Sequence, residues 1–102
     1  MTEMQEHLKA QLEIALEPSY LEVVNESDQH SGPAQDSHFK LIVVSDYFNN
    51  LKLIDRHRFI NNLFKEELTY IHALAMHTYT TSEWALKNGA PDSPQCASAP
   101  KN

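Results

Sequence analysis

Imidazole side chains are the groups in this sequence whose type best suits metal binding. The six histidines are His7, His30, His38, His57, His72 and His77. Imidazole is a common metal ligand, and in Rieske centres it replaces thiolate on one iron of a [2Fe–2S] cluster. The chain has no Cys-x-x-Cys motif, and its single cysteine, Cys96, lies close to the C-terminus. A chain that offers one or two imidazoles therefore needs a partner that supplies the sulfur ligands.

Basic side chains form the second candidate group. Five of the eight gather within 26 positions: Lys40, Lys52, Arg56, Arg58 and Lys65. The two arginines flank a histidine at the start of a predicted helix, where cations oppose the helix dipole. A phosphate or carboxylate at this helix N-terminus would relieve that repulsion. The group therefore predicts an anion-binding surface, for DNA or for an acidic patch on a partner.

The two arginines have a second interpretation. They can pair with neighbouring carboxylates of the same chain, for which the sequence offers Asp46, Asp55 and Glu66. The formal net charge of −6 also limits non-specific binding to nucleic acid, because that term scales with the number of phosphates neutralised. The sequence leaves both interpretations open.

Six predicted elements position these residues. Leu8, Leu12 and Leu16 have helical spacing, and the apolar run from His38 predicts a central strand. Thr80 and Glu83 form a capping box that starts the last helix. The predicted ranges are helix 2–16, strand 20–26, strand 38–45, helix 52–69, strand 73–79 and helix 80–88.

The order α-β-β-α-β-α predicts an α+β fold with a mixed three-stranded sheet and helices on one face. The first two strands form a hairpin despite the long loop at 27–37, and the next two are parallel because a helix joins them. Residues 1–89 therefore form one domain. Residues 90–102 are rich in Pro, Ser and Ala, and we expect a disordered tail there.

Length and composition narrow the functional classes. A chain of 102 residues, 41% of them hydrophobic, is enough for one folded domain. No apolar run approaches the roughly 20 residues that span a bilayer, and the N-terminus lacks a secretory pattern. With its lone cysteine, the chain fits the reducing cytoplasm. It has no nucleophile-elbow motif and no glycine-rich phosphate loop, so we expect a non-enzymatic protein.

Several short segments, taken in order, carry a resemblance to a known family. They are YLEVVNES, SHFK, VVSDYF, RHR, EEL, IHALAMHTYT and EW. The set resembles the BolA family, which implies a fold like a type II KH domain. With only Gly32 and Gly89 the chain lacks the GxxG loop by which KH domains clamp RNA. Where the family has F-x-G, this chain has Phe48-Asn49-Asn50, and asparagine tolerates the left-handed backbone of such a turn.

The resemblance also implies a cofactor and a partner. BolA-like proteins pair with monothiol glutaredoxins and share a [2Fe–2S] cluster, to which glutathione adds a thiolate. The family's histidine in HAL falls on His72, and its loop ligand falls on His30, with His38 as the alternative. We expect no cluster in the isolated chain, which should be a monomer or a weak dimer.

A further implication of the resemblance is transcription control. The alternative function is therefore that of a regulator that binds double-stranded DNA without a cluster. The second helix and the five basic residues named above would form its DNA-binding surface.

Overall fold

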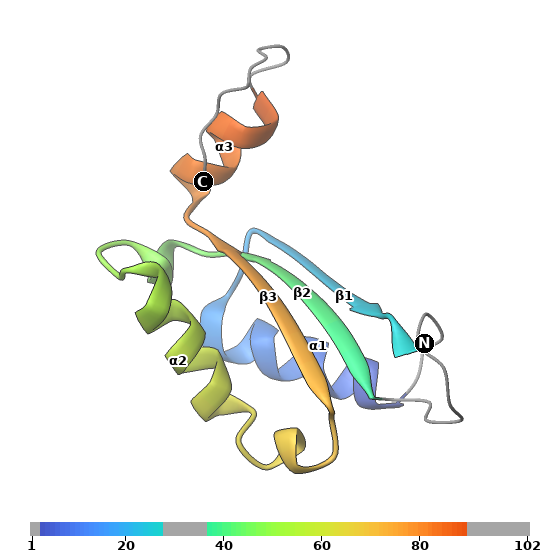
Figure 1. Cartoon of the computed structure of the whole chain (residues 1–102). Helices are drawn as coiled ribbons and strands as arrows, with labels where there is room; N and C mark the ends of the chain where they lie inside the picture. The colour runs from blue at the N-terminus through green and yellow to red at the C-terminus, as the bar shows by residue number, and fades with distance from the viewer. Residues whose placement is uncertain (1–2, 28–36, 90–102) are drawn as a thin grey trace.

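The computed structural model describes residues 3–27 and 37–89, and it confirms the predicted order of elements (Figure 1). The helices are α1 (Glu3–Leu16), α2 (Leu53–Leu63) and α3 (Thr81–Gly89). The strands are β1 (Tyr20–Asn25), β2 (His38–Val44) and β3 (Ala73–Tyr79), and two short 3-10 helices, η2 (Asp46–Phe48) and η3 (Glu67–Thr69), flank α2. The proposed ligand His30 and the proposed tail at 90–102 lie outside the described residues.

The sheet has the predicted mixed topology. Its strand order is β1-β2-β3, so the most apolar strand, β2, lies in the centre. Strand β1 runs antiparallel to β2, with Tyr20 opposite Val44, and β3 runs parallel to β2, with His38 opposite Ala73. The parallel pairing brings the starts of β2 and β3 to the same end of the sheet.

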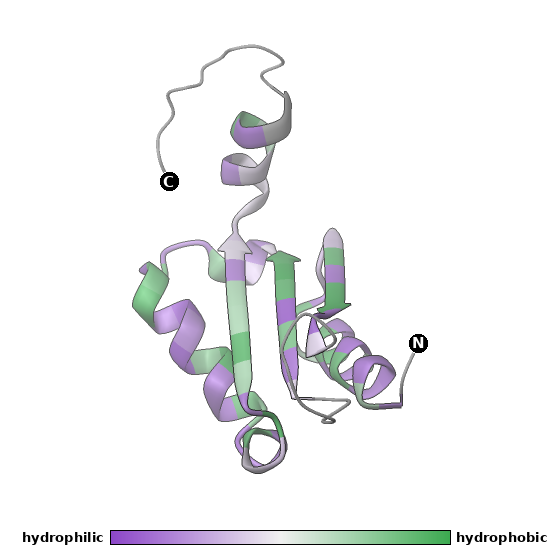
Figure 2. Ribbon diagram, turned by 45° about the vertical axis from the view of Figure 1, so that its right-hand side comes forward, coloured by the Kyte–Doolittle hydropathy of each residue, from purple (hydrophilic) through white to green (hydrophobic). Residues whose placement is uncertain are grey.

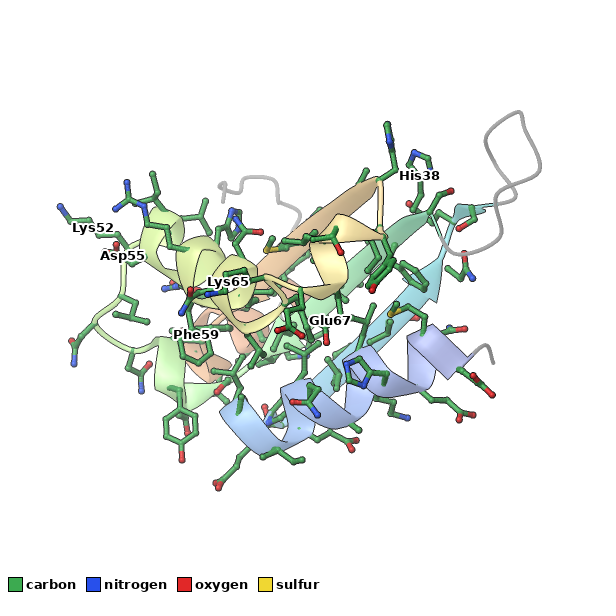
Figure 3. The ribbon with its side chains drawn as sticks, turned by 90° about the horizontal axis from the view of Figure 1, so that it is seen from below. His38, Lys52, Asp55, Phe59, Lys65 and Glu67 are labelled. Atoms are coloured by element: carbon green, nitrogen blue, oxygen red, sulfur yellow. The ribbon has the colours of Figure 1, made fainter. Side chains whose placement is uncertain are left out.

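The hydrophobic core lies between one face of the sheet and the helices α1 and α2 (Figures 1 and 3). Leu8, Leu12 and Leu16 are buried on one side of α1, as their spacing predicts. Full burial of each leucine contributes roughly 1.5–3 kcal/mol. In Figure 2 both green and purple appear along α1 and α2, because each helix buries apolar residues on the side that faces the sheet and carries polar residues elsewhere. The other buried core residues are Val23, Phe39, Leu41, Val43, Phe48, Ile60, Phe64 and Ile71.

Helix α3 is placed differently from the other two. It continues from the end of β3 and projects away from the sheet (Figure 1). Its Trp84 ring packs against Tyr20 and Tyr79, with ring centroids 5.0 and 5.1 Å apart. Aromatic contacts therefore anchor α3 to the ends of β1 and β3.

The second helix is shorter than predicted. It ends at Leu63 rather than continuing to Thr69, and the chain then turns into η3. Asn61 and Asn62 precede the end, and asparagine favours turns over helix interiors because its side chain competes for the backbone. The turn lets Phe64 and Ile71 both reach the core before β3 begins.

Two turns confirm local predictions. Asn50 has a φ of 71°, the left-handed conformation expected where the family has glycine. Helix α1 ends at Leu16, ahead of Pro18, and Glu17 takes a φ of 44° while its amide still bonds to Glu13. Within the described part of the chain, no helix has the length and apolarity that crossing a membrane requires.

Candidate functional site

His38 and His72 lie side by side where β2 and β3 begin. Their ring centroids are 5.2 Å apart, and the ring planes are tilted by 51°. His72 is exposed and His38 is half-buried. Two imidazoles bound to one tetrahedral metal through bonds of about 2.1 Å have their centres roughly 5 Å apart. The separation of the two rings therefore suits joint coordination of one metal ion.

Two serines position this histidine pair. The buried Ser27 hydroxyl accepts hydrogen bonds from the amides of Ser37 and His38, at 2.9 and 3.1 Å. The Ser37 carbonyl in turn accepts the amides of His72 and Ala73, at 2.7 and 2.9 Å. The Ser37 hydroxyl also lies 2.9 Å from Nδ1 of His38, which orients that ring. Sequence reasoning treated these serines only as loop residues, because their contacts join segments distant in the chain.

The remaining described histidines do not join the pair. His7 contacts the carboxylate of Glu67, and His77 is exposed on β3. His57 is half-buried, and its Nε2 has no hydrogen-bond partner among the described residues. Within residues 3–27 and 37–89, no group of three or more His, Cys, Asp or Glu side chains is arranged to hold a metal ion.

Arg56 is a buried structural residue, which corrects its assignment to the anion-binding group. Its side chain is only 8% exposed. The guanidinium donates to both carboxylate oxygens of Glu83 at 2.8 and 3.1 Å, and to the carbonyls of Leu51 and Thr78 at 3.0 and 3.2 Å. It also lies over the Phe48 ring. With these donors occupied, Arg56 is not available to a phosphate.

Glu83 links this arginine to the start of α3. Its carboxylate accepts the Thr80 amide at 2.9 Å, and its own amide donates to the Thr80 hydroxyl at 3.1 Å, so the predicted capping box is confirmed. The hydrogen bonds from Arg56 lower the pKa of Glu83 below its ordinary value, while partial burial opposes them. The sequence predicted the cap but not the ion pair, because the partners lie 27 residues apart.

The other basic residues divide between two surfaces. Lys40 lies on β2 and contacts Glu26 at 3.7 Å. Lys52, Arg58 and Lys65 are exposed on or beside α2, and Arg58 contacts Asp55 only weakly, at 3.8 Å. Figure 3 shows Lys52 and His38 at opposite ends of the molecule. The predicted group of five thus reduces to three cations around α2.

Helix α2 begins without a side-chain cap. Its N-cap residue, Lys52, makes no capping hydrogen bond. The first amides of a helix without a cap are left to water or to an anion. The exposed cations Lys52 and Arg58 lie within the first two turns from this end.

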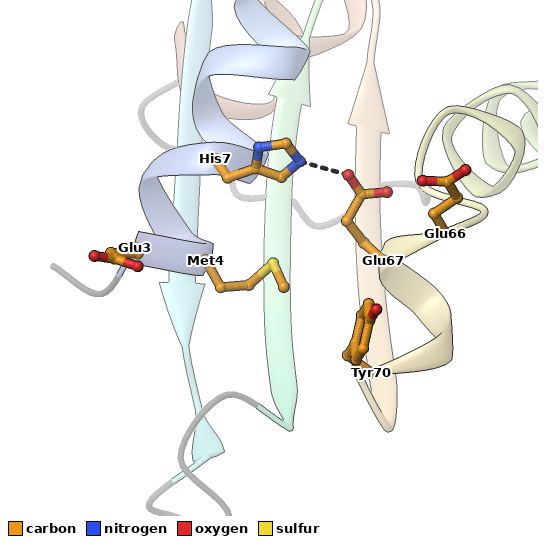
Figure 4. Close-up of a pocket in the computed structure, with 6 residues that line it drawn as sticks. All are labelled: Glu3, Met4, His7, Glu66, Glu67 and Tyr70. Atoms are coloured by element: carbon orange, nitrogen blue, oxygen red, sulfur yellow. Dashed lines mark hydrogen bonds and ion pairs between the residues drawn. The ribbon is translucent and has the colours of Figure 1, made fainter.

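A cavity of about 460 Å³ opens between the start of α1 and η3 (Figure 4). Its lining residues are Glu3, Met4, His7, Glu66, Glu67 and Tyr70. The dashed line in Figure 4 marks the contact between His7 and Glu67. Three carboxylates in one cavity disfavour an anion, so it does not extend the basic surface of α2.

Comparison with known proteins places the chain in a family. The family model for BolA-like proteins matches residues 12–83. The DNA-binding transcriptional regulator BolA of Vibrio cholerae is 45% identical over 91% of each chain, and that of Escherichia coli is 44% identical over 94% of each. The BolA domain of SufE1 from Arabidopsis thaliana superposes with a TM-score of 0.78 at 37% identity, covering 81% of this chain and 98% of that one. The fold, the family match and the extent of these identities together mean that this chain belongs to the BolA-like family.

Proposed function

We propose that this chain is a non-enzymatic regulatory protein that shares a [2Fe–2S] cluster with a monothiol glutaredoxin and acts in transcription control. The observation that carries the proposal is the pair of imidazoles of His38 and His72, 5.2 Å apart between their centroids. Hydrogen bonds fix the backbone of both residues: the His72 amide donates to the Ser37 carbonyl, and the His38 amide donates to the Ser27 hydroxyl. His72 is the principal ligand because it matches the histidine in the family's HAL motif and is exposed.

The pair fits a cluster that is completed by another molecule. A [2Fe–2S] cluster takes four ligands from outside the cluster, so His38 and His72 would supply two of them. The other two would be thiolates, which a monothiol glutaredoxin and glutathione supply. A bound cluster would provide iron whose redox state responds to its surroundings. The role of this chain is then to present His72 to the cluster that it shares with the glutaredoxin. Ser27 and Ser37 would fix the strand ends on which the two histidines lie.

Anaerobic reconstitution tests the cluster proposal. The chain is mixed with a monothiol glutaredoxin, glutathione, iron and sulfide, and visible circular dichroism is recorded. We expect a spectrum distinct from that of the glutaredoxin alone, and we expect His72→Ala to lose it. His77→Ala is the matched control, since it removes an exposed imidazole from β3, the strand that follows His72. A spectrum that survives in His72→Ala would remove this histidine as a ligand.

The second ligand is decided in the same assay. His38→Ala removes the neighbouring ring, and His30→Ala removes the loop histidine that lies outside the described residues. The geometry favours His38, and we expect its variant to shift the cluster spectrum. If only His30→Ala shifts the spectrum, the ligand pair is His30 and His72.

Binding of double-stranded DNA is the second candidate function. Two observations favour it: the names of the bacterial relatives, and the α2 N-terminus with its exposed cations. A phosphate placed there would meet unpaired amides as well as Lys52 and Arg58. Arg56 has no part in this surface, because its guanidinium is bound within the fold.

A salt titration with duplex DNA tests this surface. Arg58→Ala combined with Lys52→Ala should weaken binding. It should also reduce the slope of log K against log salt by about one for each phosphate that the protein no longer neutralises. Lys9→Ala is the control, since it removes a cation from α1 instead. A double variant that binds with the unchanged salt slope would exclude this surface.

A further inference from the structure

Strand β3 forms one edge of the sheet, and half of its backbone groups face outward. The amide of Ala73 donates to the Ser37 carbonyl, and the Tyr79 carbonyl accepts the Ser45 amide, both at 2.9 Å. In a parallel ladder this pattern directs the odd-numbered residues of β3 toward β2. The even-numbered residues therefore direct their amides and carbonyls away from the sheet.

Only one end of this outer edge is occupied. The Thr78 carbonyl accepts Nη1 of Arg56 at 3.2 Å. The outward amides and carbonyls of Leu74 and Met76 have no hydrogen-bond partner in residues 3–27 and 37–89. Figure 1 shows no strand beyond β3 within those residues. Four polar groups in the middle of β3 are thus left for another strand or for water.

The opposite edge is blocked at its centre. There, Nε2 of Gln5 donates to the Val23 carbonyl at 2.8 Å, in the middle of β1. Strand β1 also carries the exposed charge of Glu22, whereas residues 73–79 of β3 include no Asp, Glu, Lys or Arg. Charged side chains and covered backbone groups are the usual means by which proteins prevent edge pairing. The central part of β3 has neither.

We propose that two copies of this chain associate through β3, paired antiparallel about a two-fold axis at Ala75. Leu74 of each copy then lies opposite Met76 of the other, and the two pairs exchange four hydrogen bonds. These bonds satisfy the four outward groups of each copy's Leu74 and Met76. The three-stranded sheets join into one sheet of six strands, an isologous arrangement in which the same edge serves both copies.

The side chains suit this arrangement on both faces. On the open face Ala75 meets Ala75 of the second copy, and these small exposed side chains leave the backbones free to approach. On the helix face, half-buried Leu74 and Met76 form apolar cross-strand pairs. The interface is one strand wide, below the standard size of stable complexes, so association is weak and reversible.

Sedimentation velocity across concentrations up to about 1 mM tests the proposal, since weak dimers form only at high concentration. We expect a shift from monomer to dimer. Ala75→Lys places two like charges face to face at the axis and should weaken association roughly tenfold. Ala10→Lys is the matched control, because it makes the same substitution at an exposed site on α1. A monomer at all concentrations, or equal effects of the two variants, would overturn the proposal.

Hydrogen exchange locates the contact. The amides of Leu74 and Met76 should exchange rapidly in dilute samples and more slowly as concentration rises. The outward amide of Leu21 on β1 should exchange at the same rate throughout, because that edge remains unpaired. If the sample dimerises but the exchange rates of the Leu74 and Met76 amides do not change with concentration, the contact lies elsewhere and the proposal for this edge is wrong.

Discussion

The two ends of the sheet differ in how their polar side chains are bonded and exposed. Where β2 and β3 finish, Arg56, Glu83 and Thr80 form a polar network that joins α2, β3 and α3. We refer to these three residues as the polar end. Where β2 and β3 begin, His38 and His72 lie together with one ring exposed, and we refer to them as the histidine end.

The difference between the two ends separates a buried residue, which is bonded within the fold, from an exposed one that solvent can reach. A guanidinium that is 8% exposed must find acceptors within the fold, because burying an unpaired charge is strongly unfavourable. Arg56 therefore serves stability. An exposed imidazole needs no hydrogen-bond partner within the protein, because water can bond to it. His72 can therefore exchange that water for a ligand. Substitutions at the polar end should change stability, and substitutions at the histidine end should change binding.

Arg56→Ala should have the largest effect on stability. The substitution removes hydrogen bonds to Leu51, Thr78 and Glu83, and should lower the free energy of unfolding by roughly 2–4 kcal/mol. Urea denaturation measures this value. Arg58→Ala is the control: its side chain is 72% exposed and it should change stability by about 0.5 kcal/mol or less. Equal losses in the two variants would contradict the assignment of Arg56 as structural.

Thr80→Ala should have the next largest effect. It removes the hydroxyl that accepts the Glu83 amide, and loss of such a cap lowers stability by about 1 kcal/mol. Thermal or urea unfolding measures the loss. Thr69→Ala serves as a comparison, because its exposed hydroxyl bonds only to the carbonyl of Glu66, just before η3. If Thr80→Ala and Thr69→Ala are equally stable, the cap at Thr80 contributes less to the stability of α3 than we infer.

Glu83→Gln should reveal the ionic part of the network through its pH dependence. Glutamine at this position keeps the capping box but lacks the charge. Because the folded-state pKa of Glu83 lies below its ordinary value of 4.5, the ion pair stabilises the fold fully above that value. This contribution is lost as pH falls through the folded-state pKa.

At neutral pH the free energy of unfolding of the wild type should therefore exceed that of Glu83→Gln by roughly 1 kcal/mol or less, since the Glu83 side chain is 48% exposed. This difference in stability should become smaller as pH is lowered to about pH 3, and urea midpoints of both proteins at each pH measure it. A gap that stays constant would show that charge has no part in the contact.

His72→Ala should have the smallest effect on the fold. Its ring is exposed, so the free energy of unfolding should change by about 0.5 kcal/mol or less. His38→Ala should change it somewhat more, because Ser37 bonds to that ring. Urea unfolding of both variants measures the difference. A large loss of stability in His72→Ala would show that the histidine end, like the polar end, stabilises the fold.

The sequence by itself determined the elements and their order. Leucine spacing set the buried side of α1, Pro18 set its end, and the Thr80–Glu83 capping box set the start of α3. The left-handed Asn50 was also foreseeable. These features depend on local conformational preferences or on periodicity, which a chain carries before it folds. The asparagines before Leu63 carried the same kind of signal for the end of α2, but the apolar pattern beyond them predicted a longer helix.

Only the tertiary structure decided the roles of residues of the same type. Arg56 and Arg58 lie about 200° apart around α2, and the packing of the sheet and α3 determined which of them is buried. His38 and His72 became neighbours because β2 and β3 pair in one particular register. Strand β3 became an edge because it is the last strand in the order β1-β2-β3, and of the two edges only that of β1 has its middle covered by Gln5. Each outcome depends on contacts between residues far apart in the chain, which local preference does not encode.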